Sequence, residues 1–308
     1  MGLGRTLLLA AARSDTLNAF ALRSRVVKRA TRAFMPGDRM EDALVAGTVI
    51  AASGRGLLYT RLGEALTASR EAHEVRDHYL GLFDAIKQRG LPAQVSVKPT
   101  QLGIDLSLDD CAAHCTALAA RAEATGSVLW LDMEDSSYVD RTLELYATIK
   151  EHHPRAGIAL QAYLRRTPAD LQRLLPLAPV IRLVKGAYAE PAEVAFPLKR
   201  DTDAAYETIA GLMLEAAATG HCTPVLGTHD MPLLDRIRAR AKALGVPAGR
   251  YEIHMLYGIR EREQLRLRAA GESVSTLVSY GEAWYRWYMR RLAERPANLW
   301  FVARSMFG

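Results

Sequence analysis

The stretch Ile181-Arg-Leu-Val-Lys-Gly-Ala-Tyr188 decides the fold, because it is an apolar run that ends in Lys-Gly. As a strand, it places Ile181 and Leu183 on one face and Arg182 and Val184 on the other. An arginine inside a strand needs a reason, since charged groups are almost never fully buried unless they are paired. Arg182 either pairs with a carboxylate on a neighbouring strand for structural reasons, or belongs to a site at the strand's carboxyl end.

Seven more segments resemble this strand, and each is followed by a turn and a helical stretch. The eight begin at Gly56, Ala93, Ser127, Gly157, Val180, Thr223, Tyr251 and Ser273. Helical patterns cover 138–151, 168–175, 204–218, 232–244 and 261–270. Strict alternation predicts an α/β fold with a parallel sheet and right-handed crossovers, and eight units favour a (βα)8 TIM-like barrel. An open doubly wound sheet is the alternative, but no Gly-x-Gly-x-x-Gly follows an early strand.

The chain divides into an N-terminal helical appendage, residues 1–50, and a barrel domain, residues 51–308. Residues 1–32 are rich in arginine and contain one acid, Asp15, which resembles an organelle presequence. A helix with Val26, Val27, Ala30 and Phe34 in a stripe predicts packing on the barrel or contact with an anionic membrane surface. The apolar run near the start is too short to span a bilayer.

Bulk composition limits the function classes. The 308 residues are 49% hydrophobic and carry a net charge of +6, which is enough for a full core and favours anionic ligands. A noncatalytic basic module that binds nucleic acid or lipid is one alternative function. It rests on the net charge alone, and no nucleic-acid partner is expected. Cys111 and Cys115 have neither disulfide nor zinc spacing, so we expect a buried pair on a helix face and no metal site. Reduced cysteines fit a cytoplasmic location. A peripheral position on the inner membrane is a second expectation.

Polar groups collect at the predicted strand ends, where a parallel barrel carries its site. Lys98 forms a structural bridge to Asp132 in one interpretation and faces solvent or an anionic ligand in the other. Arg290 and Arg291 supply two forks for a carboxylate, or form an exposed pair with Glu294. His229 is a candidate base, ligand or donor, and Asp230 either orients it or caps a helix before Pro232. His254, within a strand, is expected to be a core residue.

Seven short blocks occur in order at successive strand or helix positions. They are Ser96-Val-Lys98, Leu131-Asp-Met-Glu-Asp135, Leu160-Gln-Ala-Tyr163, the 181–188 stretch, Thr228-His-Asp230, Met255-Leu-Tyr-Gly-Ile259 and Met289-Arg-Arg-Leu-Ala-Glu294. Together they closely resemble the proline dehydrogenase family, in its monofunctional bacterial type, from about Gly56 to the carboxyl terminus.

This resemblance implies a distorted (βα)8 barrel with N-terminal helices that holds FAD. It also implies oxidation of L-proline to Δ1-pyrroline-5-carboxylate, the first step of proline catabolism, with a quinone as electron acceptor. Asp132 and Arg182 become the catalytic residues, Arg182 near the flavin N5 region. By the same resemblance, the residues that would bind the substrate are Lys98, Tyr188, Leu256, Arg290 and Arg291. Those that would contact FAD are Met133, Gln161, Arg182, Val184, Lys185, Gly186, Ala187, Thr228, His229 and Glu294. Glu64 and Arg290 form the expected gate.

Two positions depart from the family pattern. Leu277 replaces a tyrosine expected near the substrate, and Trp287 replaces the usual tyrosine before the arginine pair. Hydroxyproline or another cyclic amino acid therefore remains an alternative substrate. A Schiff-base lyase on the same barrel, with Lys98 or Lys185 as nucleophile, is the alternative reaction.

Overall fold

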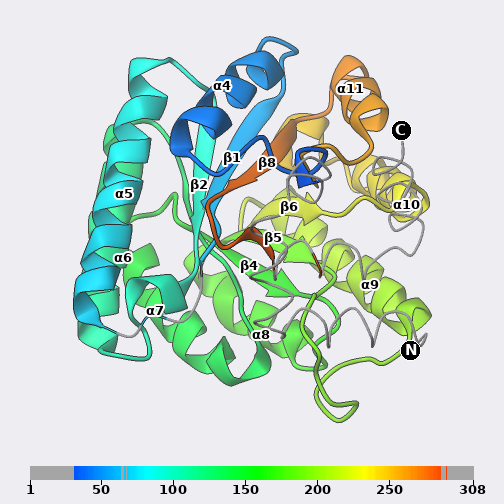
Figure 1. Ribbon diagram of the computed structural model, residues 1–308. Helices are drawn as coiled ribbons and strands as arrows, with labels where there is room; N and C mark the ends of the chain where they lie inside the picture. Colours follow the sequence, from blue (N-terminus) through cyan, green and yellow to red (C-terminus); the bar gives the residue numbers. More distant parts are fainter. Residues whose placement is uncertain (1–30, 64–65, 67, 286–288, 290–308) are drawn as a thin grey trace.

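A computed structural model describes residues 31–63, 66, 68–285 and 289 of the chain. Eight parallel strands pair in chain order, and β8 returns to β1, so the sheet is a closed barrel (Figure 1). The predicted TIM-like architecture is confirmed, and the open sheet is wrong. The strands are β1 Gly56–Arg61, β2 Ala93–Val97, β3 Leu129–Leu131, β4 Gly157–Gln161, β5 Val180–Val184, β6 Thr223–Gly227, β7 Glu252–Leu256 and β8 Val274–Tyr280.

Helices form the outer layer around these strands (Figure 1). They are α4 Met40–Ala51, α5 Ser69–Gln88, α6 Leu108–Ala124, α7 Val139–His152, α8 Thr167–Leu174, α9 Lys199–Ala218, α10 Met231–Ala243 and α11 Glu261–Ala269. Short 3-10 turns are η1 Pro99–Leu102, η2 Ser136–Tyr138, η3 Leu175–Leu177 and η4 Ala248–Arg250. The predicted helices lie within about a residue of these bounds, except that α9 begins at Lys199 rather than at 204.

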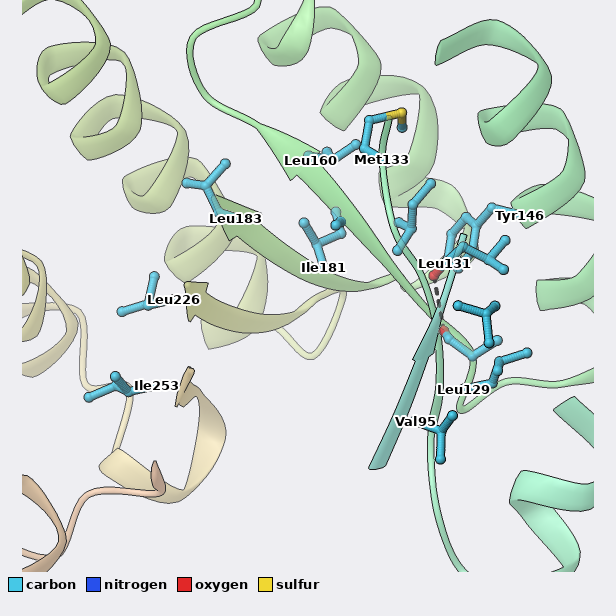
Figure 2. Close-up of a cluster of buried hydrophobic side chains, with 14 of the residues drawn as sticks. Val95, Leu129, Leu131, Met133, Tyr146, Leu160, Ile181, Leu183, Leu226 and Ile253 are labelled. Carbon is cyan, nitrogen blue, oxygen red and sulfur yellow. Dashed lines mark hydrogen bonds between the residues drawn. The ribbon is translucent and has the colours of Figure 1, made fainter. Parts of the chain in front are cut away.

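The main core lies between the outer faces of the strands and the helices. Figure 2 shows part of it, with side chains such as Leu131, Ile181, Leu183 and Leu226 from successive strands. Ile181 and Leu183 are fully buried there, on the face that the alternation predicts. Burying a side chain of this size contributes about 1.5–3 kcal/mol. The alternation therefore places Arg182 on the opposite, inner face of the barrel.

Inside the barrel the apolar filling is small. Leu58, Trp130 and Val225 form a separate buried cluster, with Leu277 packed against it. Polar side chains occupy much of the remaining interior, among them Ser96, Arg182 and His254, all buried. The barrel thus carries a polar interior that opens at the carboxyl ends of its strands.

Helix α4 lies beside β1 and β8 (Figure 1). Its buried residues Ala43, Leu44 and Ile50 belong to the main core. Residues 1–30, which make up most of the predicted appendage, lie outside the described part of the chain. In the part that is described, no helix combines the length and apolar character needed to cross a bilayer.

Candidate active site

A buried ion pair joins the carboxyl end of β3 to the middle of β5. Arg182, 4% exposed, contacts Oδ1 of Asp132 through Nη2. Ser96 Oγ on β2 donates to Asp132 Oδ1 at 2.6 Å and accepts from Arg182 Nη2 at 3.0 Å. Burial alone would raise the pKa of Asp132, but Arg182, Lys98 and Ser96 together hold that pKa below its ordinary value. Asp132 is therefore a fixed negative charge on the barrel's inner rim.

Lys98 follows β2 and faces the other oxygen of the same carboxylate. Its Nζ lies 3.7 Å from Asp132 Oδ2, and its side chain is 11% exposed. The predicted Lys98–Asp132 bridge is thus present, but it is long. It leaves N–H donors of the ammonium directed away from Asp132, because an ammonium has three. The bridge and the anion site are consequently compatible, and one lysine can serve both.

Lys185, just after β5, belongs to a second charge cluster. Its Nζ lies 2.5 Å from Asp203 Oδ1 and 2.8 Å from Asp230 Oδ2. Lys199 contacts the same two acids from the solvent side. Burial would raise the pKa of Asp230, but the two lysines hold it well below its usual range. Asp230 also caps α10, accepting from Leu233 N, so the predicted helix cap is confirmed.

The loop after β5 is docked on two neighbouring loops. Gly186 has a φ of 111° and packs on the ring of Tyr163, so a side chain cannot fit there. Further along, Glu190 Oε1 accepts from Ser136 N at 2.7 Å and Glu190 Oε2 accepts from Ser136 Oγ at 2.6 Å. An antiparallel bridge joins Leu164 to Ala195. These contacts fix the backbone that carries Lys185, Gly186, Ala187 and Tyr188.

Residues expected to contact FAD adjoin one another at the strand ends. Gln161 and Val184 stand in register on β4 and β5. Gln161 Nε2 donates to Met133 O at 3.2 Å, which brings the ends of β3 and β4 together. Among the residues that the structure describes, Gln161 Oε1 and Arg182 Nη1 are buried without a hydrogen-bond partner. Buried polar groups normally have partners, so this acceptor and this donor are available for hydrogen bonds to a ligand.

His229 lies on the next strand end. Its Nε2 accepts from Leu256 N at 2.9 Å, so that ring nitrogen carries no proton. The neighbouring Thr228 is buried, and its Oγ1 accepts from Asp230 N at 3.2 Å. His229 is therefore joined to the β7 end through Nε2.

The predicted apolar wall lies at the ends of β5, β7 and β8. Leu256 stands in register with Leu277, and both are half-buried. Tyr188 is half-buried in the loop after β5. His254, predicted as core, is buried with Nε2 3.1 Å from Glu252 Oε2. Cys111 and Cys115 are buried thiols on α6, as the pattern predicts.

Several predicted site residues lie outside the described part of the chain. They are Glu64, Trp287, Arg290, Arg291 and Glu294. The gate and two of the three carboxylate cations therefore stay predictions. Conversely, sequence reasoning gave no role to Ser96, Asp203 or Lys199. Ser96 stood inside a quoted block, and Asp203 four residues after Lys199 is a helical ion-pair spacing that could have been noticed.

A separate hollow of about 550 Å³ lies at the opposite end of the barrel, near the starts of β7 and β8. Arg238, Lys242, Tyr251 and Glu272 line it. Arg238 Nε already donates to Glu272 at 2.5 Å. The polar groups around Arg182 lie instead at the strands' carboxyl ends, where barrel enzymes build their sites.

The sequence matches a known protein family. Residues 46–304 match the family described as proline dehydrogenase. "Proline dehydrogenase 1" of Bacillus subtilis (strain 168) is 34% identical over 302 residues, which cover 98% of each chain. "Proline dehydrogenase" of Deinococcus radiodurans is 35% identical over 285 residues, 89% of this chain and 88% of that one.

Solved structures extend the comparison to the fold. Proline utilization A (PutA) from Bdellovibrio bacteriovorus superposes with a TM-score of 0.80 at 22% identity. The match covers 93% of this chain but only 38% of that longer protein. At this identity the likeness shows the barrel and not the chemistry. The family match and the two relatives that align along almost all of their length decide the assignment: the chain belongs to the proline dehydrogenase family.

Proposed function

We propose that this protein is an FAD-dependent enzyme that oxidises L-proline to Δ1-pyrroline-5-carboxylate and passes the electrons to a quinone. The observation that carries the proposal is the cluster of Lys98, Asp132 and Arg182 at the barrel mouth, with Arg182 Nη1 unpaired among the described residues. Family membership favours a dehydrogenase over the Schiff-base lyase. Lys185 also fits the lyase poorly, because two carboxylates already hold its Nζ.

The residues present fit a flavin. An isoalloxazine ring offers hydrogen-bond acceptors and one N–H donor, which match the buried donor at Arg182 Nη1 and the buried acceptor at Gln161 Oε1. Gly186 lets the backbone come close to a bound ring, because it has no side chain. Met133, Val184, Lys185, Ala187, Thr228 and His229 complete the proposed contacts. FAD, when bound, supplies the acceptor for the two electrons that leave proline.

The protein's own residues bind and orient the substrate. Lys98 supplies a cation for the proline carboxylate, and Arg290 and Arg291 are proposed to complete its clamp. Asp132 keeps Lys98 and Arg182 in place through its two oxygens. Tyr188 and Leu256 would wall the apolar ring. Oxidation at the carbon next to nitrogen needs little acid–base chemistry, so positioning supplies most of the rate enhancement.

A visible spectrum of the purified protein is the decisive experiment. A yellow flavin band that bleaches on anaerobic addition of L-proline supports the proposal, and a colourless protein that binds no added FAD overturns it. N-propargylglycine, which the description of the Bdellovibrio bacteriovorus protein names as its inactivator, is expected to inactivate this protein as well. Inactivation should be slower when proline is present.

Substitution of Lys98 separates substrate binding from cofactor binding. We expect Lys98→Met to raise KM for proline roughly tenfold or more while flavin content stays the same, because a charge-assisted hydrogen bond is lost. Lys87→Met is the matched control, since Lys87 is exposed on α5 and its Nζ donates to Ala124 O at 3.4 Å. An unchanged KM in Lys98→Met would contradict the substrate role.

Leu277 supports a second candidate substrate. It stands next to Leu256 in register and packs on Leu58, Trp130 and Val225. An aliphatic side chain offers no hydroxyl at that point, so a ring-substituted proline such as hydroxyproline meets a different wall than in relatives with a tyrosine. The ratio of kcat/KM for proline and hydroxyproline, measured for the natural chain and for Leu277→Tyr, decides between the two substrates.

The quinone and the membrane contact are proposed on the family resemblance and on the basic N-terminal segment. Reduction of a soluble quinone analogue by proline tests the acceptor. Co-sedimentation with anionic vesicles, compared with neutral ones, tests peripheral attachment. Binding that ignores lipid charge would remove the membrane part and leave the reaction intact.

A further inference from the structure

Trp130 lies inside the barrel directly beneath the ion pair. It is 1% exposed and belongs to β3, two residues before Asp132. A Cβ atom at Gly157 on β4 would approach its ring carbons to within 2.5–2.9 Å, so the indole fills the space beside that strand completely. The indole ring therefore packs directly on the backbone of β4, which limits its movement on that side.

The guanidinium of Arg182 lies over this ring. Its Cζ is 5.0 Å from the ring centroid. A cation over a tryptophan face is attracted to the ring's negative quadrupole, most strongly when both groups are removed from water. Arg182 is 4% exposed, so the contact is of the desolvated kind.

Two contacts of different kinds thus define the guanidinium's position. Asp132 and Ser96 hold one edge of it through Nη2. The Trp130 ring lies beneath its central carbon, Cζ. Edge contacts alone leave the plane free to tilt about the bonded nitrogen, and the ring beneath prevents that tilt. The atom whose direction is thereby fixed is Nη1, which has no hydrogen-bond partner within the described residues.

Trp130 is itself anchored at its indole edge. Nε1 donates to Gln94 Oε1 at 2.5 Å, and Gln94 Nε2 donates to Glu252 Oε2 at 2.9 Å. Ser275 donates to the other oxygen of Glu252. The ring of His254 meets Trp130 edge-on at 5.6 Å between centroids. The indole is therefore held by strands on both sides of the barrel interior.

We infer that Trp130 and Gln94 are positioning residues: Gln94 holds the indole, and the indole holds the Arg182 guanidinium so that Nη1 points at the bound cofactor. This inference rests on the proposed flavin chemistry at Arg182. Trp130 and Gln94 themselves touch neither cofactor nor substrate in it.

The contact is tested first without reference to flavin. The chain has four tryptophans, so its indole N–H groups give four ¹⁵N-resolved NMR signals. The signal lost in Trp130→Phe belongs to Trp130. We expect that signal to move in Gln94→Leu and in Arg182→Lys. The Trp130 signal should not move in Tyr206→Phe. That change removes a buried hydrogen bond to Leu183 O on β5, the strand that carries Arg182.

The functional consequence is tested on the flavin-loaded enzyme. A guanidinium near the ring stabilises the electron-rich reduced cofactor, so its displacement lowers the midpoint potential. Trp130→Leu, Trp130→Phe and Gln94→Leu should each lower the potential, and Tyr206→Phe should not. Trp130→Leu should also reduce kcat/KM about tenfold in the natural background and less than twofold beside Arg182→Lys.

The outcomes separate cleanly. Equal decreases in kcat/KM in both backgrounds would overturn the inference, because Trp130 would then act only through packing. An unchanged midpoint potential in Gln94→Leu and Trp130→Phe would overturn it as well. The two smaller changes keep the test valid if Trp130→Leu fails to fold. A protein without flavin would count against the proposed function, while the indole signals would still decide whether Arg182 and Gln94 are coupled to Trp130.

Discussion

Gly186 and Tyr163 approach each other so closely that a single added methyl group would overlap the tyrosine ring. The contact joins the loop after β5 to the loop after β4. Gly186 also has a φ of 111°, which side chains rarely tolerate. Sterics and backbone conformation thus both require glycine at the point where the cofactor is expected.

We expect Gly186→Ala to lower the free energy of unfolding by about 2 kcal/mol or more and to reduce flavin content. Urea denaturation and the ratio of flavin to protein absorbance measure the two effects. Gly81→Ala is the matched control, because Gly81 lies in the exposed face of α5 with nothing near its Cβ position. Gly81→Ala should raise the free energy of unfolding by about 0.5–1 kcal/mol. Equal effects of the two substitutions would contradict the steric argument.

The Arg182–Asp132 pair should behave as a buried unit. Removing one partner leaves an uncompensated buried charge, so we expect Asp132→Asn to lower the free energy of unfolding by about 3 kcal/mol. Asp132→Asn combined with Arg182→Met should cost less than the sum of the single changes. The same cycle at Asp84 and Arg121, a pair whose side chains are 45% and 39% exposed, should give a coupling below about 1 kcal/mol. Additivity at Asp132 and Arg182 would show that their contact is not energetically important.

Lys185 and Lys199 share the same two acids but differ in exposure, 25% against 71%. We expect Lys185→Met to weaken FAD binding by roughly tenfold, because a partly buried charge-assisted contact is worth more than an exposed one. Lys199→Met should change it less than about twofold. Fluorescence titration of flavin-free protein with FAD measures both. Similar losses for the two lysines would point to net charge rather than to a specific contact.

Glu252 gives a prediction about pH. Burial would raise its pKa, but His254, Ser275 and Gln94 outweigh burial and lower the pKa from 4.5 to about 2. A carboxyl whose pKa is lower in the folded state stabilises the fold above its unfolded pKa, and this contribution is lost as the pH falls from 4.5 towards about 2.

The stability lost over that interval should therefore be smaller in Glu252→Gln than in the natural chain, by roughly 3 kcal/mol. Chemical denaturation at several pH values measures it. Glu144→Gln, at an exposed position on α7, should reproduce the natural profile. A profile for Glu252→Gln that matches the natural one would mean that the contacts of Glu252 with Gln94, His254 and Ser275 are not formed in solution.

Local pattern was enough to predict the barrel, because short strand-like segments alternate along the chain with helical stretches. The alternation in the 181–188 stretch correctly separated Ile181 and Leu183 from Arg182. The start of α9 was missed by five residues, since Lys199 and Asp203 extend the helix with an exposed ion pair that apolar periodicity does not register.

The interior network was harder to predict. Gln94 and Glu252 lie 158 positions apart and meet across the barrel. Nothing in the local sequence of either residue announces the other. In the sequence Trp130 looks like any other apolar strand residue. Its contact with Arg182 depends on how β3 and β5 are placed in the barrel. Such partners follow from how the barrel closes rather than from any short motif.

Asp230 performs two tasks with one carboxylate: Oδ1 begins helix α10, and Oδ2 holds the two lysines beside β5. Evolution cannot adjust these tasks separately at this position. Any replacement that retunes the charge around Lys185 also loosens the first turn of α10, so drift in ligand preference would have to be accompanied by repair elsewhere in that helix.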